Sequence, residues 1–424
     1  MGDTMTFGLY IHVPFCLKRC GYCDFNTYTS MDMGEGASVD HYATMIIEEM
    51  ALLKRWQEEN GIAPEALSTI FFGGGTPTVL KALDLVRMVQ TAEHEWGVVD
   101  NPEITTEANP DTVDAAYLQT LKAGGFTRIS FGMQSAVPHV LKTLERTHTP
   151  ENVVTNVKAA QALGLECSVD LIYGTPGESI DDWKTSVRSA LAMQPTHISA
   201  YALTLEPTTP MGRKVDYGIL PKPNDDDEAE KYEIADSLFS EQGLAWYEIS
   251  NWAVPGHECR HNLGYWRNID WVGLGPGAHS HFGHLSASTT LPQGTYAVDS
   301  HEGFTRQHRS LPSGCSSIRA WDIRHPRRWA HAIHQGDVPW QGAESLNHQA
   351  TLEEAIMLGV RLHEGLDVES INALAGKQLQ PGIVQALHEE GLIEESSSTI
   401  VPTLHGRLLN DLIVERLLDA YTLD

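Results

Sequence analysis

Short apolar runs alternate with longer helical segments through the first half of the sequence, and this alternation restricts the possible folds more than any other feature. Six runs have the β-branched or aromatic content of buried strands: 9–13, 69–72, 103–106, 128–131, 168–172 and 197–203. Amphipathic segments begin between them, near residues 40, 82, 111, 151 and 181. Strand and helix repeating at intervals of roughly 30 residues predict βαβ units, with parallel strands inside and helices outside.

We therefore expect an α/β fold of the (β/α)6 type, a barrel or partial barrel in which the residues after each strand gather at one rim. After the sixth strand the regular spacing fades, and residues 284–318 have the composition of a polar insertion. From residue 352 the pattern is helical again, with a turn at Gly391 and a short strand near 399–401, as in a small winged-helix module. The predicted domains are a core at 1–240, a core-completing region at 241–320 and a helical C-terminal domain at 321–424.

Composition and charge exclude several classes of protein. Of 424 residues, 42% are hydrophobic and 20% are charged, which is typical of a globular protein with a sizeable core. The 56 acidic residues outnumber the 29 Lys and Arg, and a net charge of −27 would repel a phosphate backbone, so nucleic acid is not an expected partner. The sequence shows neither a long apolar span nor a signal peptide. We expect a cytoplasmic protein without stable membrane insertion.

Three of the six cysteines are grouped at Cys16, Cys20 and Cys23, a CxxxCxxC spacing directly after the first predicted strand. In a reducing compartment such a group indicates a metal site before a disulfide. A closed zinc site needs four ligands, usually from two knuckles, and only one knuckle is present; a mixed zinc site that uses a histidine is the alternative. A four-iron cluster held by three cysteines keeps one iron open for a reactive cofactor. We therefore favour an iron–sulfur cluster.

Glycines and polar residues also follow the other predicted strands. Gly74, Gly75 and Thr76 come after the second strand, where glycine lets the backbone approach a ligand and the threonine adds a hydroxyl group. Three later strands end in, or contain, a polar residue that can face the same rim: Glu107, Gln134 and Asp170. Each of these alone is more often structural, but several at one rim predict a pocket.

The CxxxCxxC spacing, with the aromatic Tyr22 before its last cysteine, resembles the radical S-adenosylmethionine superfamily. The resemblance implies a [4Fe-4S] cluster on Cys16, Cys20 and Cys23, whose open iron binds the amino and carboxylate groups of S-adenosyl-L-methionine (SAM). It also implies an electron donor that reduces the cluster, after which a carbon–sulfur bond breaks and a 5′-deoxyadenosyl radical forms. The glycine run resembles the GGTP motif of this superfamily, which contacts the methionine end of SAM.

In order along the chain, these segments resemble the coproporphyrinogen III dehydrogenases called HemN and their relatives, the HemW heme chaperones. The likeness runs from about residue 9 to 280 and resumes near 321, and it implies a partial TIM barrel. It implies a first SAM site lined by Tyr10, Gly74, Glu107 and Ala202, with Tyr22, Gly75 and Thr76 nearby. It matches Gln134, Arg146 and Asp170 to positions that contact a second SAM in the dehydrogenase. A salt bridge at the surface is the alternative role of Arg146.

Two features of this sequence distinguish the HemN dehydrogenases from the HemW chaperones. The dehydrogenase has a further cysteine two positions after the third, where this chain has Phe25, so three cluster ligands remain but a feature of the decarboxylase is missing. The HNxxYW segment at 261–266 resembles the proposed heme-binding element of HemW. Because imidazole ligates heme iron and aromatic rings offer flat apolar surface, His261 is a candidate axial ligand. The alternative for His261 is packing in the core.

The resemblance therefore implies a chaperone that binds heme and transfers it to an acceptor protein, often of the respiratory chain. The alternative is an enzyme, an oxygen-independent coproporphyrinogen III dehydrogenase, whose porphyrin substrate would need cations beside its carboxylates. A radical enzyme that acts on RNA is a third alternative, and the net charge of −27 disfavours it.

Overall fold

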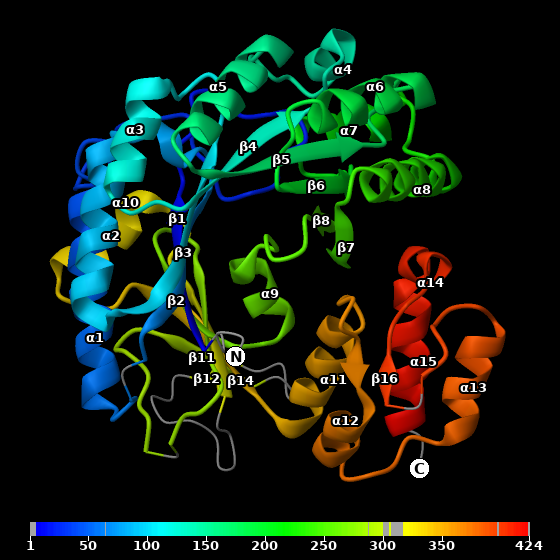
Figure 1. Ribbon diagram of the computed structural model, residues 1–424. Coiled ribbons are helices and arrows are strands. Elements are labelled where there is room, and N and C mark those ends of the chain that lie inside the picture. Colours follow the sequence, from blue (N-terminus) through cyan, green and yellow to red (C-terminus); the bar gives the residue numbers. More distant parts are fainter. Residues whose placement is uncertain are drawn as a thin grey trace.

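Six parallel strands in chain order form the centre of the computed structural model, which describes residues 6–63, 65–286, 288–299, 305–306, 317–396 and 398–422 (Figure 1). The strands are β1 (Phe7–Val13), β2 (Leu67–Gly74), β3 (Val98–Ala108), β4 (Arg128–Gln134), β5 (Glu166–Tyr173) and β6 (His197–Ala202). The helices on their outer side are α1 (Tyr42–Glu59), α2 (Ala82–Trp96), α3 (Ala115–Ala123), α4 (Pro138–Thr143), α5 (Pro150–Ala162) and α6 (Ile180–Leu191). All six predicted strands and all five predicted helices are confirmed; the short α4 was not expected.

Capping residues explain where several of these helices begin. Ser179 and Asp182 form a reciprocal capping box at the start of α6. Thr149 caps α5, and Pro150 follows at the first helical position, where its missing N–H costs nothing. Beyond β6 come α7 (Pro210–Asp216) and α8 (Asp225–Glu241), and Asn224 caps α8 ahead of an acidic first turn that suits a helix N-terminus.

The barrel stays open because β1 and β6 do not pair with each other. Instead, β9 (Asp270–Leu274) pairs in parallel with β1, while β8 (Asn251–Ala253) pairs antiparallel with β6 and then with β7 (Ala245–Glu248). Helix α9 (Arg260–Trp266) lies on the concave side of the sheet, where it packs against β1 and β2 (Figure 1). The predicted partial barrel is confirmed, and its open side is bordered by strands from the region after residue 240.

Further strands extend the sheet beyond β9. In order from β9 they are β10 (His279–Phe282), β13 (Ser317–Asp322), β14 (Trp340–Leu346), β11 (Tyr296–Asp299) and β12 (Thr305–Arg306). Helix α10 (Pro326–His334) connects β13 to β14 and packs against α1. The expected polar insertion therefore contributes β11, β12 and the start of β13, preceded by loop residues 284–286 and 288–295, whereas Cys315 lies outside the described residues. The boundaries at 241 and 321 stay a prediction.

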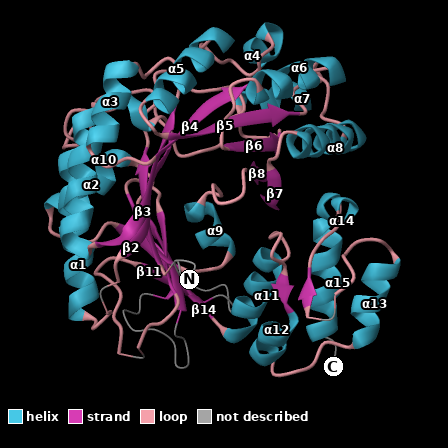
Figure 2. Cartoon of the chain, in the orientation of Figure 1, coloured by secondary structure: helices cyan, strands magenta, loops and turns pink. Residues whose placement is uncertain are grey.

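The C-terminal helices form a separate core beside the barrel (Figure 2). The elements are α11 (His348–Gly359), β15 (Leu366–Asp367), α12 (Val368–Ala375), α13 (Pro381–Glu389), β16 (Thr399–Ile400), α14 (Leu404–Leu408) and α15 (Asn410–Thr422). Strands β15 and β16 pair antiparallel, so the expected small helical module with a short sheet is confirmed. The closing helix α15 begins at Asn410, directly after the short α14.

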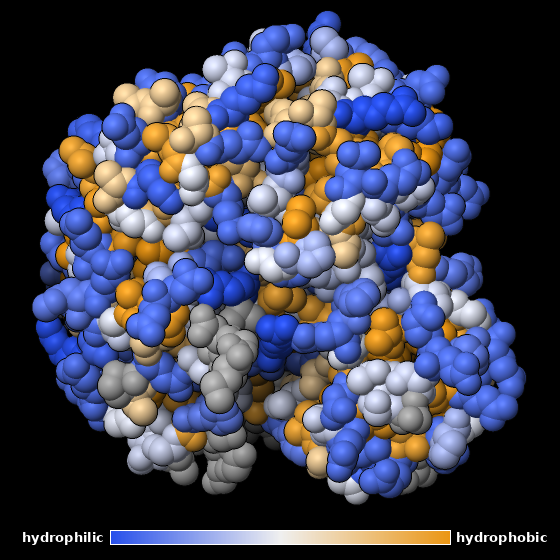
Figure 3. Space-filling model, viewed as in Figure 1, coloured by the Kyte–Doolittle hydropathy of each residue, from blue (hydrophilic) through white to orange (hydrophobic). Residues whose placement is uncertain are grey.

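Hydrophilic residues dominate the face of the molecule seen in Figure 3, with small hydrophobic patches between them. This surface agrees with the excess of 56 acidic over 29 basic residues. Within the described part of the chain, none of the helices combines the length and the apolar character needed to cross a membrane.

One arginine joins the C-terminal helices to the barrel. The Arg407 guanidinium, at the end of α14, binds both carboxylate oxygens of Asp236 on α8 at 2.8 and 3.1 Å. It also lies over the ring of Trp246 on β7, 4.4 Å from the centroid. The side chains of Arg407 and Asp236 are only 7% and 17% exposed, so the pair is shielded from water.

Replacing Arg407 with alanine should lower the free energy of unfolding by about 3 kcal/mol, because it leaves Asp236 largely buried without its cation. Arg416 offers a matched control, since it pairs with Glu390 at 2.7 Å on the surface, and Arg416→Ala should cost at most about 1 kcal/mol. Urea denaturation followed by circular dichroism measures both. Equal losses in the two variants would contradict the role of Arg407.

Candidate functional site

A cavity of about 650 Å³ occupies the interior of the partial barrel. Its lining comes from the strands β1 to β6, the loop that follows β1, and α9. Every predicted site residue lines it: Tyr10, Cys16, Cys20, Tyr22, Cys23, Gly74, Gly75, Thr76, Glu107, Gln134, Arg146, Asp170, Ala202 and His261. The structure thus brings together positions as far apart in the sequence as Tyr10 and His261, although the role of each position stays a prediction.

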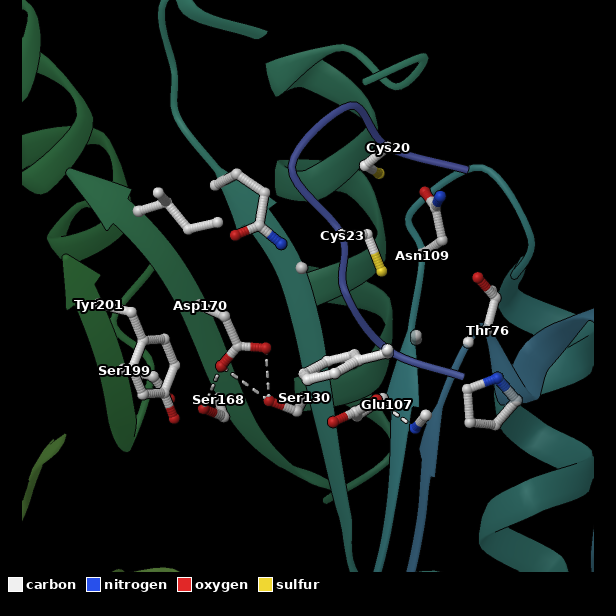
Figure 4. Close-up of a pocket in the computed structure, with 18 of the residues that line it drawn as sticks. Cys20, Cys23, Thr76, Glu107, Asn109, Ser130, Ser168, Asp170, Ser199 and Tyr201 are labelled. Carbon is white, nitrogen blue, oxygen red and sulfur yellow. Dashed lines mark hydrogen bonds between the residues drawn. The ribbon is translucent and has the colours of Figure 1, made fainter. Parts of the chain in front are cut away.

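The loop after β1 carries the three cysteines along the wall of this cavity. Its ends are held together because the Cys16 amide donates to the Tyr28 carbonyl at 3.0 Å and the Tyr28 amide donates to the Pro14 carbonyl at 2.7 Å. Asn26 anchors the loop to the rest of the barrel through a 2.8 Å hydrogen bond to the Pro276 carbonyl. All three cysteines are free thiols, and Figure 4 shows Cys20 and Cys23 extending from the loop above the strands.

Hydrogen-bond donors face two of the sulfur atoms. The Thr76 hydroxyl donates to Cys16 Sγ at 3.7 Å, and the Arg146 guanidinium donates to Cys20 Sγ at 3.5 Å. Burial raises the pKa of Cys16 to about 11, while the Thr76 hydrogen bond acts in the opposite direction. Donors and a cation beside buried sulfur stabilise negative charge, which is the form in which cysteine binds metal.

The surroundings of the thiols fit an iron–sulfur cluster. A Cβ atom on Gly75 would lie 2.7 Å from the Phe15 carbonyl and 3.0 Å from Cys16 Sγ, so only glycine leaves this side of the loop clear. Across the described ranges, no three His, Cys, Asp or Glu side chains are placed to hold one metal ion. A four-iron cluster takes each thiolate on a different iron, so its ligands need not meet at a single point.

Two carboxyl groups face the centre of the cavity from neighbouring parts of the barrel. Glu107, at the end of β3, accepts a 3.2 Å hydrogen bond from the Gly74 amide, and Gly74 has a φ of 107° that favours glycine. Asp170 on β5 accepts hydrogen bonds from the Ser130 hydroxyl at 2.9 Å and the Ser168 hydroxyl at 3.4 Å (Figure 4). These contacts fix both carboxyl groups toward the space between the strands.

Burial shifts the pKa values of both acids. It raises the pKa of Glu107 to about 8, and the charge of Asp170 acts in the same direction. It also raises the pKa of Asp170, partly offset by hydrogen bonds from serine hydroxyls. At pH 7 Glu107 therefore holds its proton, and a cation bound beside it would favour the ionised form.

Gln134 and Arg146 lie on the side of the cavity formed by β4. Gln134 ends this strand with a φ of 63°, in the left-handed region that non-glycine residues rarely adopt, and such outliers concentrate at functional sites. Arg146 donates to the Gly132 carbonyl at 2.9 Å and has no carboxylate within ion-pair distance among the described residues. The described residues therefore show no salt bridge for Arg146, and its role as a ligand stays a prediction.

His261 lines the cavity, but its ring is already fully engaged. It is 3% exposed, with Nδ1 2.8 Å from the Thr69 hydroxyl and Nε2 2.9 Å from the Tyr265 hydroxyl. The ring also stacks on Phe71, with centroids 4.9 Å apart. Burial lowers the pKa of His261 to about 3, so the imidazole is neutral. To bind iron, His261 would have to lose one of these hydrogen bonds, and its role as an axial ligand stays a prediction.

Three strands that the sequence analysis treated as apolar place polar side chains in the cavity. On β4, β5 and β6 a polar–apolar–polar triplet repeats: Arg128-Ile129-Ser130, Ser168-Val169-Asp170 and His197-Ile198-Ser199. Both polar members of each triplet line the cavity. Because side chains alternate across a strand, this period of two was the signal that could have identified them.

Arg128 and His197 lie at the beginnings of their strands, away from the cysteine loop. Arg128 is 2% exposed, donates to the His257 carbonyl at 2.9 Å and lies 3.9 Å from Glu103. Glu103 in turn accepts hydrogen bonds from the first amides of α9, so this buried pair fixes that helix in the barrel. Neither residue lies at the carboxyl end of a strand, which is where the sequence motifs directed attention.

Comparison with known proteins relates this fold to the radical SAM superfamily. Residues 10–190 match the model of the radical SAM superfamily, and residues 346–409 match that of the HemN C-terminal domain. The chain is similar in fold to the solved structure of coproporphyrinogen III oxidase (HemN) from Escherichia coli, with a TM-score of 0.74 over 99% of this chain and 90% of that one. Their identity is 18%, so this likeness concerns the fold alone.

Closer relatives identify the family. The chain is 38% identical to the heme chaperone HemW of Mycobacterium tuberculosis over 97% of its length and 95% of the relative. It is 31% identical to the heme chaperone HemW of Bacillus subtilis over 95% of its length and 96% of that relative. The chain belongs to the HemW family of the radical SAM superfamily.

Replacing any one of Cys16, Cys20 and Cys23 with serine should lower the iron and sulfide content of the anaerobically purified protein about tenfold, because a cluster with two thiolates is poorly held. Cys167 is the control, since it is a free thiol buried in β5 and away from the loop. Cys167→Ala should keep full iron and sulfide. Chemical analysis and the absorbance near the cluster band measure the result, and unchanged stoichiometry in the loop variants would refute the cluster.

Replacing Glu107 with glutamine should stabilise the protein without bound SAM at high pH. The native state retains the Glu107 proton up to about pH 8 while the unfolded chain releases it near 4.5, so this group lowers the free energy of unfolding as pH rises between those values. Glu107→Gln removes that effect and should gain on the order of 2–4 kcal/mol at pH 8 but little at pH 5.

The matched control for loss of one carboxyl group is Glu58→Gln, on the exposed side of α1. Urea denaturation of wild type and both variants at the two pH values gives the comparison. A gain for Glu107→Gln that is equal at pH 5 and pH 8 would show that burial of this carboxyl group has no energetic consequence.

Proposed function

We propose that this chain is a heme chaperone, which binds heme and transfers it to an acceptor protein, and that it holds a [4Fe-4S] cluster and SAM as resident cofactors. The observation that carries the proposal is its likeness to named heme chaperones along nearly the whole chain, at 38% identity over 97% of its length. The cavity supports it, because three free thiols, a glycine-lined wall and two half-buried carboxyl groups meet in one space.

When bound, the cluster would supply an open iron site and an electron for SAM. In this proposal Cys16, Cys20 and Cys23 hold the cluster, and Gly74 and Gly75 leave room beside it. Glu107 provides the carboxylate that faces a cationic group of SAM, whose arrival would favour loss of its proton. A second SAM molecule would bind beside Asp170, Gln134 and Arg146, which line the same cavity.

Phe25 favours the chaperone over the coproporphyrinogen III dehydrogenase. It stands where the dehydrogenase has its additional cysteine, and its side chain is 59% exposed beside the cavity. An exposed phenylalanine offers flat apolar surface to a porphyrin but no thiol chemistry. The acceptor, which we expect in the respiratory chain, the electron donor and a cytoplasmic location also remain proposals.

Two assays on the anaerobically reconstituted protein test the function. Ferric heme should bind with micromolar or tighter affinity, seen as a shifted Soret band, and should pass to an apo-acceptor protein when the two are mixed. Coproporphyrinogen III incubated with reductant and SAM should remain unchanged. Formation of protoporphyrinogen IX would show that the chain is an enzyme, and the absence of any heme-dependent spectral change would refute the chaperone.

A further inference from the structure

A second cavity, of about 780 Å³, opens beside the first on the other side of the cysteine loop. The two cavities share five lining residues: Tyr10, Phe25, Gly74, Glu107 and Tyr265. The second cavity adds residues from the strands that extend the sheet beyond β1, namely Trp271 on β9, His279 on β10 and Trp321 on β13. None of these three was a candidate in the sequence analysis.

The imidazole of His279 is free to bind a ligand. His279 is exposed, and its ring nitrogens have no hydrogen-bond or ion-pair partner in the part of the chain that the structure describes. Partial burial and the nearby charges of Arg319 and Arg324 lower its pKa, so the ring is neutral at pH 7 and keeps the lone pair that binds iron. His261 differs in that it is buried and both of its ring nitrogens are hydrogen-bonded.

Two tryptophans contact His279, one through its backbone and one through its ring. Trp271 Nε1 donates to the His279 carbonyl at 3.0 Å, and the ring centroid of Trp321 lies 6.2 Å from that of His279. Tyr265 contacts Trp271 edge-on, with centroids 4.9 Å apart. Together with the exposed Phe25, these rings line the same cavity as the imidazole and offer flat apolar surface to a planar macrocycle.

A cation stands at the edge of the same cavity. Arg324 is exposed, and its guanidinium forms no ion pair with any residue within the described ranges. Its carbonyl accepts hydrogen bonds from Asn26 at 2.7 Å and from the Tyr28 hydroxyl at 3.3 Å, which fix the Arg324 backbone against the cysteine loop. In a chain with a net charge of −27, an unpaired arginine beside an aromatic cavity is suited to a carboxylate group on the ligand.

We propose that the iron porphyrin binds in this second cavity, with His279 as its axial ligand and Arg324 paired with one of its carboxylates. The inference rests on the proposed heme-chaperone function and deepens it, because it assigns the binding cavity and replaces His261 as the iron ligand. It places the porphyrin next to the SAM cavity, with Phe25 and Tyr265 in the wall between them.

The test is a titration of the reconstituted protein with ferric heme, read by absorbance and electron paramagnetic resonance. His279→Ala should weaken heme binding at least tenfold and remove the spectral features of imidazole ligation. His279→Gly with added imidazole should recover them. His94→Ala, at an exposed histidine on α2, is the matched control and should bind like wild type. Circular dichroism and iron content confirm that each variant folds and carries its cluster.

Two further comparisons make the test decisive. Arg324→Ala should weaken binding of heme about fivefold without changing the spectrum, and it should leave the affinity for heme dimethyl ester, which lacks free carboxylates, unchanged. If wild type binds heme but His279→Ala keeps its spectrum and affinity, or if His261→Ala alone removes imidazole ligation, this inference is overturned while the chaperone function stands. If wild type shows no heme binding, the proposed function fails as well.

Discussion

Parallel pairing of six consecutive strands is the constraint on which the rest of the structure depends. It brings the loop after β1, the glycines after β2 and the carboxyl group at the end of β3 to one rim, although they are far apart in sequence. Right-handed helical connections keep these loops on the same side of the sheet. The cysteines alone would specify a metal-binding loop, and the sheet is what supplies a walled cavity beside it.

The interior of the open barrel is polar, and its polar side chains need hydrogen-bond or ion-pair partners. Asp170 is stabilised by hydroxyl groups, Arg128 by Glu103, and His261 by two hydrogen bonds, whereas Glu107 accepts a single amide hydrogen bond and keeps its proton. Asp170, Arg128 and His261 thus have partners within the protein. Glu107, at the end of β3, has fewer, which is the expected arrangement when a ligand completes the contacts there.

The sequence predicted the barrel and most of the first cavity for identifiable reasons. Strand runs such as 168–172 are short and apolar, and the CxxxCxxC spacing of the cysteines is highly specific. It did not predict β9 to β14, because strands such as His279–Phe282 are short and rich in polar residues, and their pairing partners are remote in sequence. Arg128 and His197 were missed because they lie at the beginnings of their strands, whereas the prediction favoured the carboxyl ends.

The two histidines illustrate why sequence motifs and ligand sites can diverge. His261 belongs to a recognisable HNxxYW segment, yet the fold uses its imidazole to join Thr69 on β2 to Tyr265 on α9, so its environment explains it without a ligand. His279 has no motif of comparable specificity, but within the described chain its imidazole has no hydrogen-bond partner and lies beside the Trp321 ring in a cavity. The HNxxYW segment can therefore contribute to a heme site by positioning Tyr265, which lines both cavities. In our proposal the iron ligand itself, His279, comes from β10, which lines only the second cavity.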